Sequence, residues 1–87
     1  MTTTVELYFR LGEREKALGI AKTLVSRAEE MINYLIEKDL PVGIELRKNM
    51  FIIGDLQRIM MENGEQELAD QYEQMYQRHI NDLGLGQ

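Results

Sequence analysis

The chain has no cysteine and no tryptophan, and its 87 residues include one histidine, one serine and one proline. The lack of cysteine excludes disulfides and thiolate metal sites. With one histidine, and no carboxylates at ligand spacing on a predicted loop, the common metal sites are excluded as well. A glycine-rich phosphate loop is also missing. We therefore expect no metal and no cofactor.

The residues needed for catalysis are equally sparse. Ser26 falls in the middle of a predicted helix, far in sequence from His79, and has no flanking glycine elbow. Acid–base catalysis requires two carboxylates that converge in a dry cleft. The acidic residues instead lie in first helical turns or on polar faces, where Glu29 and Glu30 are predicted as solvated neighbours. We expect no catalytic residues and no enzyme activity in this chain.

Long apolar runs are missing, because the longest, Met50 to Ile53, falls far short of the ~18 residues that span a bilayer. This predicts a soluble domain without direct membrane insertion. The formal charge is −5, and residues 63–87 hold five acidic side chains against Arg78. An acidic surface repels phosphate backbones, so we expect no nucleic-acid partner. Solubility alone also explains such a charge.

One short phrase occurs twice, at residues 12–17 and 64–69, and reads G-E-x-E-x-A both times. A glycine that ends one helix, an acidic first turn and a small alanine for close packing together specify a helical hairpin. The repetition predicts an all-α chain built from two antiparallel helical hairpins. The two copies are 52 residues apart, against the ~34 of a tetratricopeptide repeat. The helices are therefore expected to be stretched.

Apolar periodicity predicts a short helix, two long helices and a C-terminal helix in one domain over residues 1–87. Their expected ranges are 3–11, 14–38, 42–62 and 65–83. Thr3 and Glu6 have capping-box spacing at the first helix, and Pro41 breaks the chain before the third. Gly54, inside the third helix, marks a close approach of another helix.

The second helix carries the longest apolar stripe. Its members are Ala17, Leu18, Ile20, Ala21, Leu24, Val25, Ala28, Met31, Ile32, Leu35 and Ile36. The first predicted helix is about half as long as the others. We therefore expect part of the upper face of its partner helix to be uncovered.

Three residues are candidates for an interaction surface because they do not fit the core pattern. Tyr8 and Phe9 are adjacent and cannot both point into the same seam, so one of them is expected to face outward or toward something that this chain lacks. Met61 falls off the main stripe of the third helix and is expected on an exposed apolar patch. Methionine also lines adaptable binding grooves, although core filling explains most of the other methionines.

Tyr72, Tyr76 and His79 lie at i, i+4 and i+7 on one face of the last helix. One interpretation is a hydrogen-bonding patch for a ligand. The favoured alternative is an amphipathic edge whose polar tips remain in water.

Two phrases resemble the turn between the helices of a tetratricopeptide repeat. The matching positions are Tyr8 to Glu13, Ala17 and Ala21, then Asn63 to Glu65, Ala69 and Tyr76. This resemblance implies a tetratricopeptide-like fold. The family binds peptides through its inner helices, and the first of these is too short here to carry any binding residue over.

The chain also resembles the C-terminal tail of a family of bacterial multi-pass membrane proteins that are similar to protein O-mannosyltransferases. The matching stretches are Leu11 to Ala21 and Glu62 to Glu73. This resemblance implies that the chain is a fragment, a small domain appended to a glycosyltransferase-like core in the bacterial inner membrane. The catalytic residues and membrane-spanning helices of such a core are not in this sequence.

The sequence therefore leaves two alternative predictions of function. The first is a non-catalytic accessory domain that packs against the parent membrane core or holds a protein or peptide partner. The second is a free-standing soluble adaptor that binds a peptide or a helix, or that forms a homodimer through the uncovered apolar stripe.

Overall fold

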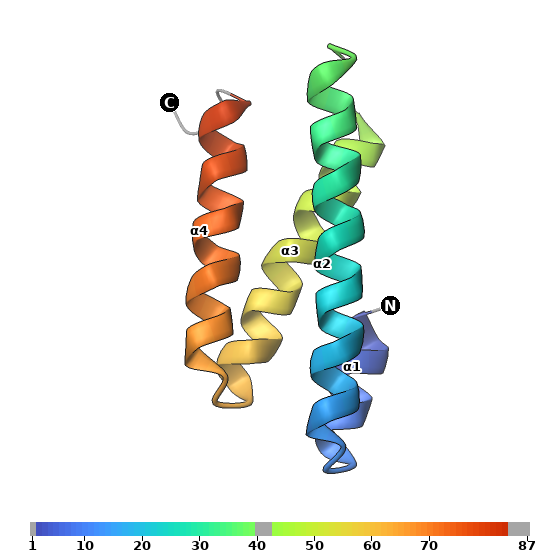
Figure 1. The fold of residues 1–87 in the computed structure, drawn as a ribbon, viewed down its shortest axis with the longest axis vertical. Coiled ribbons are helices and arrows are strands. Elements are labelled where there is room, and N and C mark those ends of the chain that lie inside the picture. Colours follow the sequence, from blue (N-terminus) through green and yellow to red (C-terminus); the bar gives the residue numbers. More distant parts are fainter. Residues whose placement is uncertain (1, 40–42, 84–87) are drawn as a thin grey trace.

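The computed structural model describes residues 2–39 and 43–83. This part of the chain forms four α-helices and no strand (Figure 1). The helices are α1 (Thr2–Arg10), α2 (Arg14–Glu37), α3 (Ile44–Glu62) and α4 (Gln66–Asp82). The predicted all-α fold of antiparallel helical hairpins is confirmed, and each helix end lies within two residues of its predicted position.

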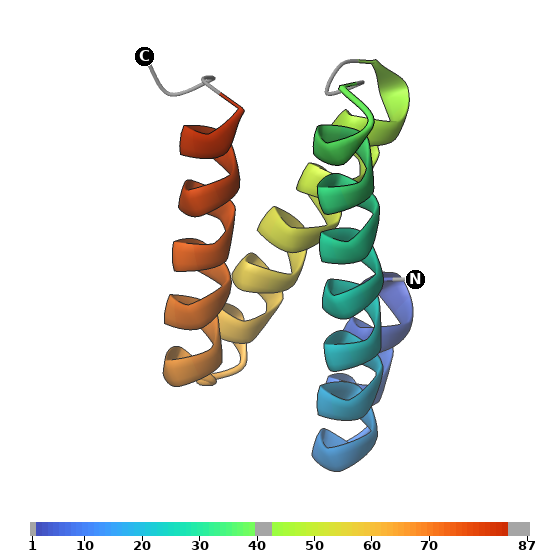
Figure 2. The ribbon, with the colours of Figure 1, turned by 45° about the horizontal axis from the view of Figure 1, so that its top comes forward.

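The helices pack as two successive hairpins, α1 with α2 and α3 with α4. α3 crosses diagonally and contacts each of the other three helices, so it lies between α4 on one side and α2 on the other (Figures 1 and 2). α1 has nine residues and α2 has 24. α1 therefore runs beside the lower part of α2 only (Figure 2).

The first copy of the repeated phrase forms a tight helix-ending turn. Gly12 has a φ of 76°, which is in the left-handed region. The Glu13 N–H donates to the Tyr8 carbonyl at 2.8 Å, and the Gly12 N–H donates to the Phe9 carbonyl at 3.1 Å. These two hydrogen bonds define a Schellman motif, in which glycine avoids the steric penalty of its conformation.

The second copy repeats this geometry. Gly64 also has a φ of 76°, and the Glu65 N–H donates to the Met60 carbonyl at 2.8 Å. The alanine that closes each phrase, Ala17 or Ala69, is at most 1% exposed. The repeated sequence is therefore a repeated turn, and each alanine lies in the core as predicted.

The two turns are also joined directly. The Arg14 guanidinium, just after the first turn, donates to both carboxylate oxygens of Glu65 in the second, at 2.7 and 2.8 Å. Its hydrogen bonds hold the pKa of the Glu65 carboxyl below its usual value. A two-pronged contact of this kind fixes orientation as well as distance.

The core lies along the seam between α2 and α3 and continues under α1 and α4. Its members on α2 are mostly small in the lower half of that helix, whereas α3 contributes six larger apolar side chains. The buried apolar residues are Val5, Ala17, Ala21, Val25, Ala28, Ile32, Leu35, Leu46, Met50, Ile53, Leu56, Ile59, Met60, Ala69 and Tyr72. α3 supplies the most bulk because it packs against three helices.

Gly54 marks a close approach, as predicted. A Cβ at this position would lie 3.6 Å from Cε2 of Tyr76 on α4. The missing side chain therefore makes room for the Tyr76 ring against α3.

Two details of the predicted helix starts are wrong. α1 begins at Thr2, so Thr3 lies inside the first turn and is not the N-cap. α3 begins at Ile44, and Gly43 precedes it with a φ of 98°, outside the helical region. The predicted break at Pro41 lies outside the described residues.

Two glycine-to-alanine variants should move stability in opposite directions. We expect Gly64→Ala to lower the free energy of unfolding by about 1–2 kcal/mol, because alanine is strained in the left-handed region. Gly19 lies inside α2 with nothing within 4 Å of an added Cβ. Gly19→Ala should therefore raise the free energy of unfolding by about 1 kcal/mol through helix propensity. Urea titrations followed by circular dichroism measure the free energy of unfolding of both variants. A change in the same direction in the two variants would contradict the assignment of the turn.

Replacing the arginine between the turns should change the titration of its partner. In Arg14→Gln we expect the pKa of Glu65 to rise towards its usual value, measured by NMR of the side-chain carboxyl. Because the pKa is lowered in the folded state, the contact stabilises the fold above the ordinary carboxyl pKa. That contribution is lost as the pH falls through the lowered pKa. An unchanged titration of Glu65 would rule the contact out in solution.

Candidate functional site

One side of α2 and of its C-cap residue carries a row of side chains that are exposed or only partly buried. It contains seven residues, and each follows the previous one after three or four positions in the sequence. We call it the open stripe, and its members are Lys16, Ile20, Leu24, Arg27, Met31, Tyr34 and Lys38. Ile20 and Leu24 are partly buried, whereas Met31 is 38% and Tyr34 52% exposed. The apolar stripe that was expected to be uncovered in the upper half of α2 is mostly buried there, since Ala28, Ile32 and Leu35 are at most 8% exposed and only Met31 is exposed.

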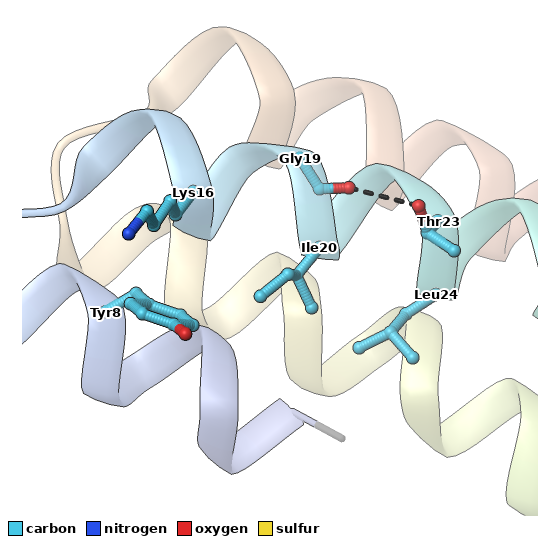
Figure 3. A pocket seen from close by; sticks show the side chains of 6 residues that line it. All are labelled: Tyr8, Lys16, Gly19, Ile20, Thr23 and Leu24. Carbon is cyan, nitrogen blue, oxygen red and sulfur yellow. Dashed lines mark hydrogen bonds between the residues drawn. The ribbon is translucent and has the colours of Figure 1, made fainter.

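The lower part of the open stripe borders a hollow between α1 and α2 (Figure 3). The hollow has a volume of about 380 Å³. Its lining is Tyr8, Lys16, Gly19, Ile20, Thr23 and Leu24. In Figure 3 the side chains of Ile20 and Leu24 project from α2 on the side of α1, while Thr23 donates to the Gly19 carbonyl at 3.2 Å. The floor of this hollow is therefore apolar and its rim is polar.

A second, smaller hollow of about 120 Å³ begins at the first residue of α1. It is lined by Thr2, Leu24, Lys48, Phe51 and Ile52. Leu24 lines both hollows, so the apolar surface continues from α2 past the start of α1 and onto α3. Phe51 is 67% exposed at its far side.

The charged side chains that line the two hollows, Lys16 and Lys48, are both cationic. The Lys16 ammonium lies 5.8 Å from the centroid of the Tyr8 ring, and Lys38 lies 5.9 Å from that of Tyr34. Arg27 lies between them along the open stripe. The Lys16 ammonium also lies 3.6 Å from a carboxylate oxygen of Glu13, so this cation already has a partner within the chain.

The candidate residues Tyr8, Phe9 and Met61 differ in their exposure. Tyr8 lines the larger hollow and is partly buried. Phe9 is also partly buried, and both side chains pack against the core, so neither is fully exposed, while Tyr8 also borders the larger hollow. Met61 is 55% exposed on α3, as predicted, but it lines neither hollow.

The face of α4 that was predicted to keep its polar tips in water is instead largely buried. Tyr72 is 4% and His79 2% exposed, and Tyr76 is partly buried beside Gly54. Burial raises the pKa of the Tyr72 phenol. The structure therefore removes Tyr72 and His79 from any interaction surface.

His79 reaches α2 instead. Its Nε2 lies 2.9 Å from Oε2 of Glu29, and the Arg78 guanidinium donates to the same oxygen at 2.9 Å. Glu29 is thus partly buried and bonded across the two helices, which corrects its prediction as a solvated neighbour of Glu30. Within the described part of the chain, Nδ1 of His79 has no hydrogen-bond partner.

This cluster joins α2 to α4 and offers little chemistry. The imidazole of His79 is 2% exposed, and both it and the Arg78 guanidinium contact the same carboxylate oxygen of Glu29. Over residues 2–39 and 43–83, no three histidine, cysteine or carboxylate side chains are grouped so that they could hold a metal ion. Among the four helices described, none combines the length and apolar character needed to cross a membrane.

Comparison with known proteins returns no match: no protein-family model, no curated protein and no solved structure is significantly similar to this chain.

Sequence reasoning did not single out the residues that form the two hollows, apart from Tyr8. Ile20 and Leu24 were assigned to the apolar stripe of the second helix. The short first helix indicated that α1 covers only part of α2, but α3 buries most of the predicted apolar stripe beyond it. Which residues are uncovered depends on where α3 crosses α2, and helical periodicity does not specify that crossing.

The contact between Glu29 and His79 can be tested with a pair of adjacent variants. We expect Glu29→Ala to lower the free energy of unfolding by about 1–3 kcal/mol, because it leaves a buried imidazole without its partner. Glu30→Ala removes an exposed carboxylate from the next residue and should change the free energy of unfolding by less than about 0.5 kcal/mol. Urea unfolding of both variants measures the difference. Equal effects would show that His79 does not depend on Glu29.

Proposed function

We propose that this chain is a non-catalytic helical interaction domain, and that the open stripe is its binding surface. The observation that carries the proposal is the row of apolar side chains Ile20, Leu24, Met31 and Tyr34, interrupted by Arg27, on the side of α2 next to the face that forms the core. Contiguous exposed apolar surface on a small domain is typical of protein interaction sites. The order of the helices, with two successive hairpins joined by the same turn, supports a tetratricopeptide-like arrangement.

We further propose that the domain is an accessory part of a larger glycosyltransferase-like protein of the bacterial inner membrane. The support is the resemblance of residues 11–21 and 62–73 to the tails of that family. In this setting the open stripe would contact the membrane core of the parent protein or a partner held beside it. The alternative is a free-standing adaptor or homodimer, which the same exposed stripe also supports.

Site-specific photocrosslinking tests the binding surface. With p-benzoylphenylalanine in place of Tyr34 in the open stripe, we expect an adduct of defined mass in cells that produce the protein. With the same group in place of Gln71, which is exposed on α4, we expect no adduct. Adducts at both positions, or at neither, would contradict the assignment of the binding surface.

An immunoblot of fractionated cells separates the two settings. An accessory domain predicts a band far above 10.2 kDa in the membrane pellet. A free-standing adaptor predicts a band near 10.2 kDa in the soluble fraction. The second result would overturn the membrane-protein proposal while leaving the binding surface to be tested by crosslinking.

A further inference from the structure

We propose that the open stripe binds an amphipathic α-helix of a partner protein whose apolar face is flanked by carboxylates. This inference rests on the proposed function, because it assigns a chemical class to the partner of that surface. Three observations support it: the spacing of the stripe, the charges beside it, and the packing of the apolar side of α4 within its own hairpin.

The spacing of the stripe suits a helix. Its members follow one another at steps of three and four residues, the pattern with which a second helix packs along the first. From Lys16 to Lys38 the stripe is about 33 Å long at 1.5 Å per residue, enough for about six turns of a partner. The two hollows that meet at Leu24 give room for apolar side chains of that partner.

The charges of the stripe are of one sign. Lys16, Arg27 and Lys38 are eleven residues apart, so they return to nearly the same side of α2 after every three turns. On α3, Lys48 lines the smaller hollow, and the carboxylate of Glu45, one turn earlier, lines neither hollow. Lys16 already lies 3.6 Å from a carboxylate oxygen of Glu13, so a partner with acidic flanks would place negative charge mainly beside Arg27, Lys38 and Lys48.

Most of the cations beside the stripe have no carboxylate partner among the described residues, although Lys16 lies 3.6 Å from a carboxylate oxygen of Glu13. Arg14, Arg58 and Arg78 each contact carboxylates of a different helix of this chain. Over the described residues, Arg27 and Lys48 have no ion pair. These two cations are therefore available to carboxylates of a partner.

A second copy of the chain is a poorer occupant. The most acidic helix, α4, turns its apolar side chains towards α3, where Tyr72 is buried and Tyr76 packs against Gly54. It could insert into the open stripe of another copy only by leaving its own hairpin. The partner is thus expected to be a different chain segment with a free apolar face.

The test uses the full chain and two synthetic helical peptides of 21 residues with the same leucine stripe. One peptide has glutamate on both flanks of the stripe, and the other has lysine. We expect the glutamate peptide to shift the NMR signals of Ile20, Leu24, Met31 and Tyr34, and to bind about tenfold more tightly at low salt. Added salt should reduce this difference.

Charge-reversal variants provide the matched control. Arg27→Glu should weaken the glutamate peptide about fivefold or more, whereas Lys22→Glu makes the same charge change on an exposed position of α2 outside the stripe and should leave binding unchanged. Circular dichroism and unfolding of both variants confirm that they remain folded.

Each contrary result overturns the proposal. No binding of either peptide at millimolar concentration excludes a helix as the partner, and equal binding excludes the acidic flank. Shifts confined to other faces exclude the stripe. A concentration-dependent mass in sedimentation, abolished by Arg27→Glu, makes a second copy the occupant. If neither peptide binds but crosslinking at Tyr34 gives an adduct, the proposed interaction function is retained. Only the chemical class assigned to the partner is then excluded.

Discussion

Both hairpins depend on a glycine held in the left-handed region at the end of a helix. Gly12 and Gly64 share a φ of 76°, and each turn is closed by an N–H that reaches five residues back. This geometry reverses the chain within three residues and fixes which face of the next helix lies inward. The burial of Ala17 and Ala69 follows from that placement, since each lies one turn into the helix that the turn begins.

The small residues of α2 have a second effect. Ala17, Ala21 and Ala28 let α2 lie close to its neighbours, so the space in this part of the core is filled largely by side chains of α1 and α3. The larger residues on the adjacent side, such as Met31 and Tyr34, are therefore not required to complete the core. The same packing that stabilises the fold leaves apolar surface available for binding.

Much of this fold could be predicted because turn chemistry and apolar periodicity are local properties. The repeated phrase located both turns, and Gly54 indicated a close helix contact, which proved to be with Tyr76. The environment of His79 could not be predicted in this way. Periodicity placed it on one side of α4, but its contact is with Glu29, fifty residues earlier and on a different helix. The open stripe likewise depends on where α3 crosses α2.

The position of α3 has a consequence for how the molecule folds. Helices adjacent in the chain pack together, so most tertiary contacts form by closing short loops at little entropic cost, and folding should be fast for a domain of this size. α3 contacts all three of the other helices. The two hairpins can therefore stabilise each other only after α3 has packed against α2. Backbone amides in the middle of α3 should consequently exchange with solvent only when the whole domain opens, whereas those of α1 should exchange through local fraying.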